Sequence, residues 1–188
     1  MIRIPVRLLV LTVAVLATLG VVSPASAATS PYCGITWGSL DKDSATGSGG
    51  YVDDVRAGQH TCYDRLVVDV HGSRTYGTWH AGYVDQVSAD PSGLPVSLRG
   101  GAFLQLTLRA PTVTPNGTVT YAPADDRELV DVTGFRTFRQ IALTGQFEGV
   151  TTIALGVRAR LPFHVSAVTG IPGTANGTRV VLDVAHSW

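Results

Sequence analysis

Short runs in which apolar and polar residues alternate recur along most of this chain. In 101–109, alanine and three leucines take every second position, and Phe103, Gln105, Thr107 and Arg109 take the others. A period of two predicts a β-strand that buries one face. The same pattern, or a dense β-branched run, predicts further strands at 65–71, 79–87, 129–133, 139–144, 150–158, 163–169 and 178–185.

Residues that favour turns separate these runs, at 90–93, 115–117 and 176–177. The Asn and Gly residues in them tolerate the positive φ that hairpin turns require. About eight strands with one apolar face each predict an all-β fold, an antiparallel two-layer β-sandwich, with a closed barrel as the alternative. The Pro- and Thr-rich stretch 110–126 predicts a mobile loop or an extended hairpin tip.

Two of the predicted strands repeat one another. The segments 65–70 and 179–184 both consist of Arg, three branched apolar residues, Asp and Val. The repeat has two interpretations. It reflects either convergent strand composition, or equivalent positions of the first and last core strands in a pseudo-symmetric sandwich.

The first 27 residues follow a different pattern. Arg3 and Arg7 precede an apolar and small run at 8–22, and Ala-Ser-Ala at 25–27 is a small-x-small cleavage site. This order is typical of a secretory signal peptide, and about 15 residues is short for a bilayer span of roughly 20. The sequence predicts a secreted, extracellular protein with no stable membrane anchor after cleavage of 1–27; a retained membrane helix is the alternative.

Cys33 and Cys62 are the two cysteines of the chain. In an exported protein an even pair indicates a disulfide, with two free thiols as the alternative. Closing a loop of about 30 residues would constrain the unfolded chain by roughly 3–4 kcal/mol on the loop-entropy account. Because the enclosed segment is polar and Gly-rich, we predict an N-terminal arm at 28–61 pinned to a domain at 62–188.

Charge and motifs disfavour several classes of function. Loss of Arg3 and Arg7 lowers the 14 basic residues to 12 against 14 acidic ones, and such a near-neutral chain without basic clusters does not suit nucleic acid. The sequence contains no nucleophile elbow, zinc-protease motif or patterned calcium loop. We predict a non-enzymatic protein with no metal and no cofactor. The alternative is a hydrolase with a carboxylate pair, formed by Glu128 or Glu148 with Asp85 or Asp131.

Five side chains are candidates for contact with a ligand: Asp64, Arg65, Trp79, Tyr83 and Glu148. Carboxylates accept hydrogen bonds, and exposed aromatic rings, Tyr76 included, stack on the apolar faces of sugars. Each candidate has a structural alternative: an ion pair for the glutamate, an ion pair or turn cap for the Asp–Arg pair, and core packing for the rings. The binding interpretation predicts that Glu148, Arg65 and Trp79 share one exposed face.

The order of several segments resembles a known family. These segments are RAGQHTCYDRLVVDVHG at 56–72, GQFEGVTTIALGV at 145–157 and RVVLDVAHSW at 179–188. Together they are similar to the exported actinobacterial proteins described as AMIN-like domain-containing proteins, from Cys33 to Trp188. The resemblance implies a β-sandwich related in shape to AMIN domains, which are non-catalytic modules that target envelope proteins or bind peptidoglycan. Many relatives carry a lipobox Cys, whereas Cys33 lies several residues beyond the predicted cleavage site.

These observations predict a secreted or wall-associated, non-catalytic binding module of the cell envelope. Its partner would be peptidoglycan, another wall glycan or another envelope protein. The alternative is a secreted accessory or inhibitor protein that presents the disulfide-pinned arm and the 110–126 loop to a protein partner.

Overall fold

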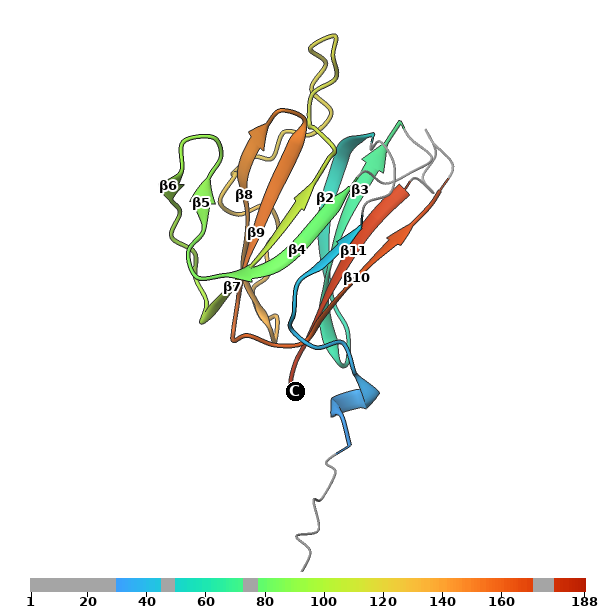
Figure 1. The fold of residues 1–188 in the computed structure, drawn as a ribbon, viewed down its shortest axis with the longest axis vertical. Coiled ribbons are helices and arrows are strands. Elements are labelled where there is room, and N and C mark those ends of the chain that lie inside the picture. The colour runs from blue at the N-terminus through green and yellow to red at the C-terminus, as the bar shows by residue number, and fades with distance from the viewer. Residues whose placement is uncertain (1–29, 45–49, 73–77, 171–177) are drawn as a thin grey trace, which may run out of the picture.

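The computed structural model describes residues 30–44, 50–72, 78–170 and 178–188, which form two antiparallel sheets packed against each other (Figure 1). The five-stranded sheet has the order β1 (Lys42–Ser44), β4 (Trp79–Val84), β7 (Ala102–Leu108), β9 (Val150–Val157), β8 (Phe138–Phe147). The four-stranded sheet has the order β10 (Phe163–Val168), β11 (Thr178–Ala185), β3 (Tyr63–His71), β2 (Tyr51–Gln59). A hairpin of β5 (Ser88–Ala89) and β6 (Leu94–Pro95) and a 3-10 turn, η1 (Tyr32–Gly34), complete the described elements. The predicted β-sandwich is confirmed; a closed barrel is wrong, because the two main sheets remain separate.

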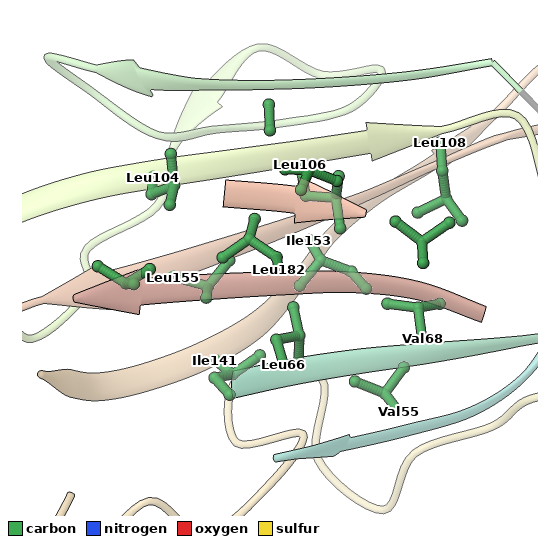
Figure 2. Close-up of a cluster of buried hydrophobic side chains, with 14 of the residues drawn as sticks. Val55, Leu66, Val68, Leu104, Leu106, Leu108, Ile141, Ile153, Leu155 and Leu182 are labelled. Atoms are coloured by element: carbon green, nitrogen blue, oxygen red, sulfur yellow. The ribbon is translucent and has the colours of Figure 1, made fainter. Parts of the chain in front are cut away.

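The core lies between the two sheets (Figure 2). Leu104, Leu106 and Leu108 of β7 point inward at every second position, as the alternation predicts, and meet residues such as Leu66 and Leu182 from the other sheet. Each fully buried leucine contributes about 1.5–3 kcal/mol relative to its exposed state. This apolar layer holds the two sheets together and leaves their outer faces to carry polar side chains.

Part of the outer face of the five-stranded sheet is covered by the chain itself. A Cβ added to Gly156 would lie 1.8 Å from the Arg99 backbone oxygen, so the segment before β7 rests directly on β9. Asp90 is bound there too, since its N–H donates to the Thr144 oxygen at 2.9 Å and its Oδ2 accepts from Thr152 Oγ1 at 2.8 Å. This cover buries both faces of β9, which is why alternation alone cannot identify its core face.

Residues 51–59 form β2, an edge strand, although their polar, Gly-rich context predicts an arm outside the sandwich. The register against β3 shifts between Val52 and Asp54. Such a bulge resets the alternation of a strand, so Val52 and Val55, three residues apart, both face the core. The range 28–61 thus contributes β1 to one sheet and β2 to the other, and the assignment of this range to an arm is corrected.

The predicted strand at 129–133 is wrong. Leu129 packs against the core and its N–H donates to the Ile141 oxygen at 2.9 Å, but the chain then turns, with Asp131 Oδ1 accepting from the Thr133 N–H at 2.8 Å. A short apolar run buried beside a sheet edge has the composition of a strand without its pairing.

The stretch 110–126 divides into a packed base and a projecting tip. Thr120 Oγ1 donates to the Val52 oxygen at 2.7 Å, and Tyr121 packs against the core. The tip at 113–119 carries the turn predicted at 115–117, closed by a bridge between Val113 and Val119, and extends beyond the sandwich (Figure 1, yellow). The hairpin-tip prediction therefore applies to the middle of the stretch.

The predicted disulfide between Cys33 and Cys62 is confirmed, with the two Cα atoms 6.2 Å apart. After it the chain runs beside β10, where the Phe163 N–H donates to the Gly38 oxygen at 2.9 Å, and then pairs with β4 as β1. It thereby crosses from one sheet to the other. Since Cys62 directly precedes β3, the disulfide anchors this crossing segment to the four-stranded sheet.

The signal peptide predicted at 1–27, Tyr76 and the turn at 176–177 lie outside the described residues. Within the described residues, no helix has the length and apolar character needed to cross a membrane.

Candidate functional site

The two repeated segments pair with each other as neighbouring strands of the four-stranded sheet. Their antiparallel register sets Arg65 against Asp183 and Asp69 against Arg179, with Val67 and Val181 between them. Because the strand direction reverses, the Arg of each copy meets the Asp of the other, and opposite charges across strands stabilise a sheet. The repeat therefore reflects charge pairing within one sheet, on its outer face.

Arg65 and Asp183 form a bidentate ion pair. Arg65 Nε lies 2.7 Å from Asp183 Oδ1, and Nη2 lies 2.8 Å from Oδ2. The hydrogen bonds that Arg65 donates to Asp183 raise the pKa of Arg65 above its ordinary value, so the guanidinium stays charged. In the described part of the chain these bonds leave its Nη1 donors unused. The pair thus presents a fixed cation with donors directed away from its carboxylate.

A groove of about 390 Å³ runs beside this pair. Its lining includes the buried side chains of Val67 and Val181, flanked by Arg56, Arg65 and Arg179. Arg56 is also held by an ion pair, since its Nε lies 2.8 Å from an Asp69 carboxylate oxygen. Apolar side chains between guanidinium groups give a surface that can contact a ring face and donate several hydrogen bonds at its edges.

A cluster of aromatic rings adjoins the groove at the start of β3. The Trp37 ring centroid lies 5.6 Å from those of both Tyr63 and His164, and Tyr63 stacks on His60 at 4.7 Å. The Arg65 guanidinium carbon lies 5.2 Å from the Tyr63 centroid, within the range of a cation–π contact. Trp37 reaches this position because the disulfide fixes the chain four residues before it. We call these four rings with Arg65 and Asp183 the ring–arginine face.

Asp64 faces the opposite way from Arg65 and is fully buried. Its Oδ2 accepts from the N–H groups of Thr137 at 2.6 Å and Phe138 at 3.0 Å, and its Oδ1 lies 2.9 Å from His186 Nε2. A carboxylate with three partners at the start of β8 and near the C-terminus ties three segments together. The assignment of Asp64 to ligand contact is corrected, since no solvent reaches it.

Trp79 and Tyr83 pack into the core rather than forming an exposed platform. The Tyr83 hydroxyl donates to the Leu161 oxygen and accepts from the Leu161 N–H, both at 2.9 Å. Burial is the main cause that raises the pKa of Tyr83. Sugar stacking on these two rings is therefore corrected to core packing, because their strand turns them inward.

Glu148 is exposed in the turn between β8 and β9. Asp64 binds the backbone at the start of β8, and Glu148 follows its end, so the ten residues of that strand separate Glu148 from Arg65, roughly 30 Å at strand rise. Trp79 is buried in the other sheet from Arg65. The prediction that these three residues share one exposed face is wrong.

The remaining members of the ring–arginine face were not identified from the sequence. Asp183 was signalled by the repeat, whose Asp and Arg positions mark one face of each strand. The other members, Trp37, His60, Tyr63 and His164, come from the arm, β3 and its flank, and β10, so no local pattern connects them.

Of the carboxylate pairs predicted for a hydrolase, Glu128 and Asp131 line the same pocket. Glu128 forms a bidentate ion pair with Arg99. Hydrogen bonds from Thr133 lower the pKa of Asp131, whereas a glycosidase needs one carboxyl whose pKa is raised so that it can act as an acid. This arrangement is typical of structural ion pairing.

Comparison with known families gives a match over most of the chain. The family described as AMIN-like domain matches residues 50–186. No curated protein matches the chain. The matched range begins just before β2 and includes the strands from β2 to β11 and the His186 that binds Asp64, whereas Trp37 and β1 lie before it.

Proposed function

The chain belongs to the AMIN-like domain family, and from this premise we propose that it is a non-catalytic binding module that holds a wall glycan, such as peptidoglycan, on its ring–arginine face. The family suggests a module of the cell envelope. The disulfide is compatible with an extracellular or envelope location, because such bonds persist in oxidising compartments.

The observation that carries the proposal is the position of Trp37 and Tyr63 beside the Arg65–Asp183 pair. Half-exposed rings offer flat surfaces to the apolar faces of sugars. The fixed guanidinium donates to hydroxyl or carboxylate oxygens, and its geometry favours bidentate contacts. Stacking and charge-assisted hydrogen bonds within one patch suit a glycan that carries carboxylates.

The test is co-sedimentation of the purified protein with cell-wall sacculi over several salt concentrations. We expect the native protein to be retained, and Trp37→Ala and Arg65→Gln each to weaken retention about tenfold, equivalent to 1.4 kcal/mol. Trp188→Ala is the matched control, because Trp188 is 64% exposed and binds the Arg160 oxygen instead of the ring cluster. Circular dichroism of each variant confirms that the sandwich is folded.

Absence of retention by the native protein would overturn the proposal. An equal loss in Trp37→Ala and Trp188→Ala would show that any exposed tryptophan contributes, and would remove the ring–arginine face from it.

A secreted protein-binding accessory protein is the second candidate. The observation that favours it is the exposure of Val113, Val119 and Phe147, three apolar side chains at 39–58% exposure on the projecting tip and the nearby turn. Thr112 Oγ1 donates to the Gln146 side chain, which brings the base of the tip to the end of β8. This candidate predicts that sacculi do not retain the native protein, and that Val119→Ser and Phe147→Ser weaken capture of a secreted protein partner.

A further inference from the structure

A second hollow, of about 540 Å³, lies on the five-stranded sheet. Asp43 of β1 pairs with His80 of β4, and His80 with Thr107 of β7, so the register sets three polar side chains in one row across three strands. They face outward because Trp79 and Ala81, on either side of His80, point into the core. This hollow is therefore separated by the whole sandwich from the ring–arginine face.

One side of the hollow is acidic. Asp43 Oδ1 lies 3.2 Å from His80 Nδ1, and Asp41 Oδ2 lies 3.9 Å from His80 Nε2. Both carboxylates are more than half exposed, so they remain open to a cationic group from solvent.

The other side of the hollow is cationic. Arg109 follows β7, where its N–H donates to the Thr78 oxygen at 2.8 Å. Because Leu108 pairs with Thr151, the preceding residue of β9, Val150, lies beside Arg109 in the lining of the hollow. Among the described residues the Arg109 guanidinium has no hydrogen-bond or ion-pair partner, in contrast to Arg56, Arg65 and Arg99. It is an exposed cation at the edge of a hollow, opposite a carboxylate.

We propose that this hollow binds a short zwitterionic peptide, with the peptide carboxylate on Arg109 and its ammonium group on Asp43. Arg109 and Asp43 stand two strands and about two residues apart, roughly 12 Å between Cα atoms at normal sheet spacing. An extended dipeptide separates its end charges by about 6–7 Å, which leaves room for the two side chains. The Thr107 hydroxyl then faces the peptide group and Val150 a small side chain. This site is independent of the glycan-binding proposal.

The probe is alanyl-alanine, with its N-acetyl and C-amide derivatives, titrated into the purified protein and followed by chemical shifts of backbone amides. We expect saturable shifts at residues of β4 and β7 for the free dipeptide. Either cap should weaken binding about tenfold, as loss of a charge-assisted hydrogen bond implies. Arg109→Gln should weaken binding of the free dipeptide by the same factor as the C-amide cap does, and should weaken binding of the C-amide derivative little further. Likewise, Asp43→Asn should weaken binding of the N-acetyl derivative little further.

Arg136→Gln is the control, because Arg136 is exposed and its guanidinium makes one hydrogen bond within the described residues, to the Thr61 oxygen at 3.4 Å. The proposal is overturned if the free dipeptide causes no saturable shift at millimolar concentration, if the capped forms bind as tightly, or if Arg136→Gln has the effect of Arg109→Gln. Sacculus retention does not enter this test, so failure of one proposal leaves the other intact.

Discussion

Glu148 holds a backbone conformation that is unfavourable for its residue type. It occupies the first position of a two-residue turn between the paired residues Phe147 and Val150, with φ of 49°, followed by Gly149 at 79°. Two positive φ values are the signature of the hairpin turn that prefers Asn-Gly. A side chain with a Cβ in this region costs about 1–2 kcal/mol, and Asn reduces that cost by local hydrogen bonding.

We therefore expect Glu148→Asn to raise the free energy of unfolding by about 0.5–1 kcal/mol, and the melting temperature by about 1–4 °C. Thermal unfolding followed by circular dichroism measures the change. Glu148→Gln removes the same charge without easing the backbone, so it should not stabilise. An equal gain in both variants would attribute the effect to charge.

Asp64 is a buried residue whose carboxylate binds two backbone N–H groups and the His186 ring. Asp64→Asn keeps the shape but loses a carboxylate that accepts from Thr137, Phe138 and His186. An amide offers one acceptor and places N–H donors where another donor already points. We expect a loss of about 2–3 kcal/mol in the free energy of unfolding, measured by urea titration.

Asp69→Asn is the matched control, since its carboxylate binds Arg56 at the surface, where ion pairs contribute about 0–1 kcal/mol. If both variants lost the same stability, the buried network around Asp64 would contribute no more than a surface pair.

At the scale of the element, sequence patterns identified most strands but did not identify which strands pair with each other. The strand predicted at 178–185 has the observed bounds of β11. β2 was missed because its bulge breaks the alternation, and 129–133 was mistaken for a strand because edge burial selects the same residues. Local composition reports what a segment buries, whereas pairing depends on segments distant in sequence.

The arm between the disulfide and β1 gives a prediction at this scale. Cys33→Ser with Cys62→Ser removes a cross-link between residues 29 apart in sequence, and we expect the free energy of unfolding to fall by about 3 kcal/mol. Chemical unfolding with and without reductant measures this. Reductant should lower the stability of the native protein and leave that of the double variant unchanged. A double variant as stable as the native protein would show that β1 pairing alone holds the arm.

For the whole molecule, the outer faces of the two sheets differ because different segments cover them. The segment before β7 lies across β8 and β9, with no room for a Cβ at Gly156. On the outer face of the four-stranded sheet, Arg56, Arg65 and Arg179 stay at least partly exposed beside the buried Val67 and Val181, and the crossing arm contributes Trp37. Among the described residues, this face and the uncovered end of the five-stranded sheet are therefore the two sheet surfaces to which we assign small ligands.

The sequence by itself determined that the chain is all-β, that its strands bury one apolar face, and that its cysteines pair. These properties follow from period-two alternation, turn residues and an even cysteine count, all of which are local or compositional. Only the tertiary structure decided that Asp64 and Arg65, adjacent in sequence, point into the core and to the surface, and that Trp37, Tyr63 and His164 meet. Side chains on one strand separate by face, and those from distant strands come together through register, which no short window of sequence contains.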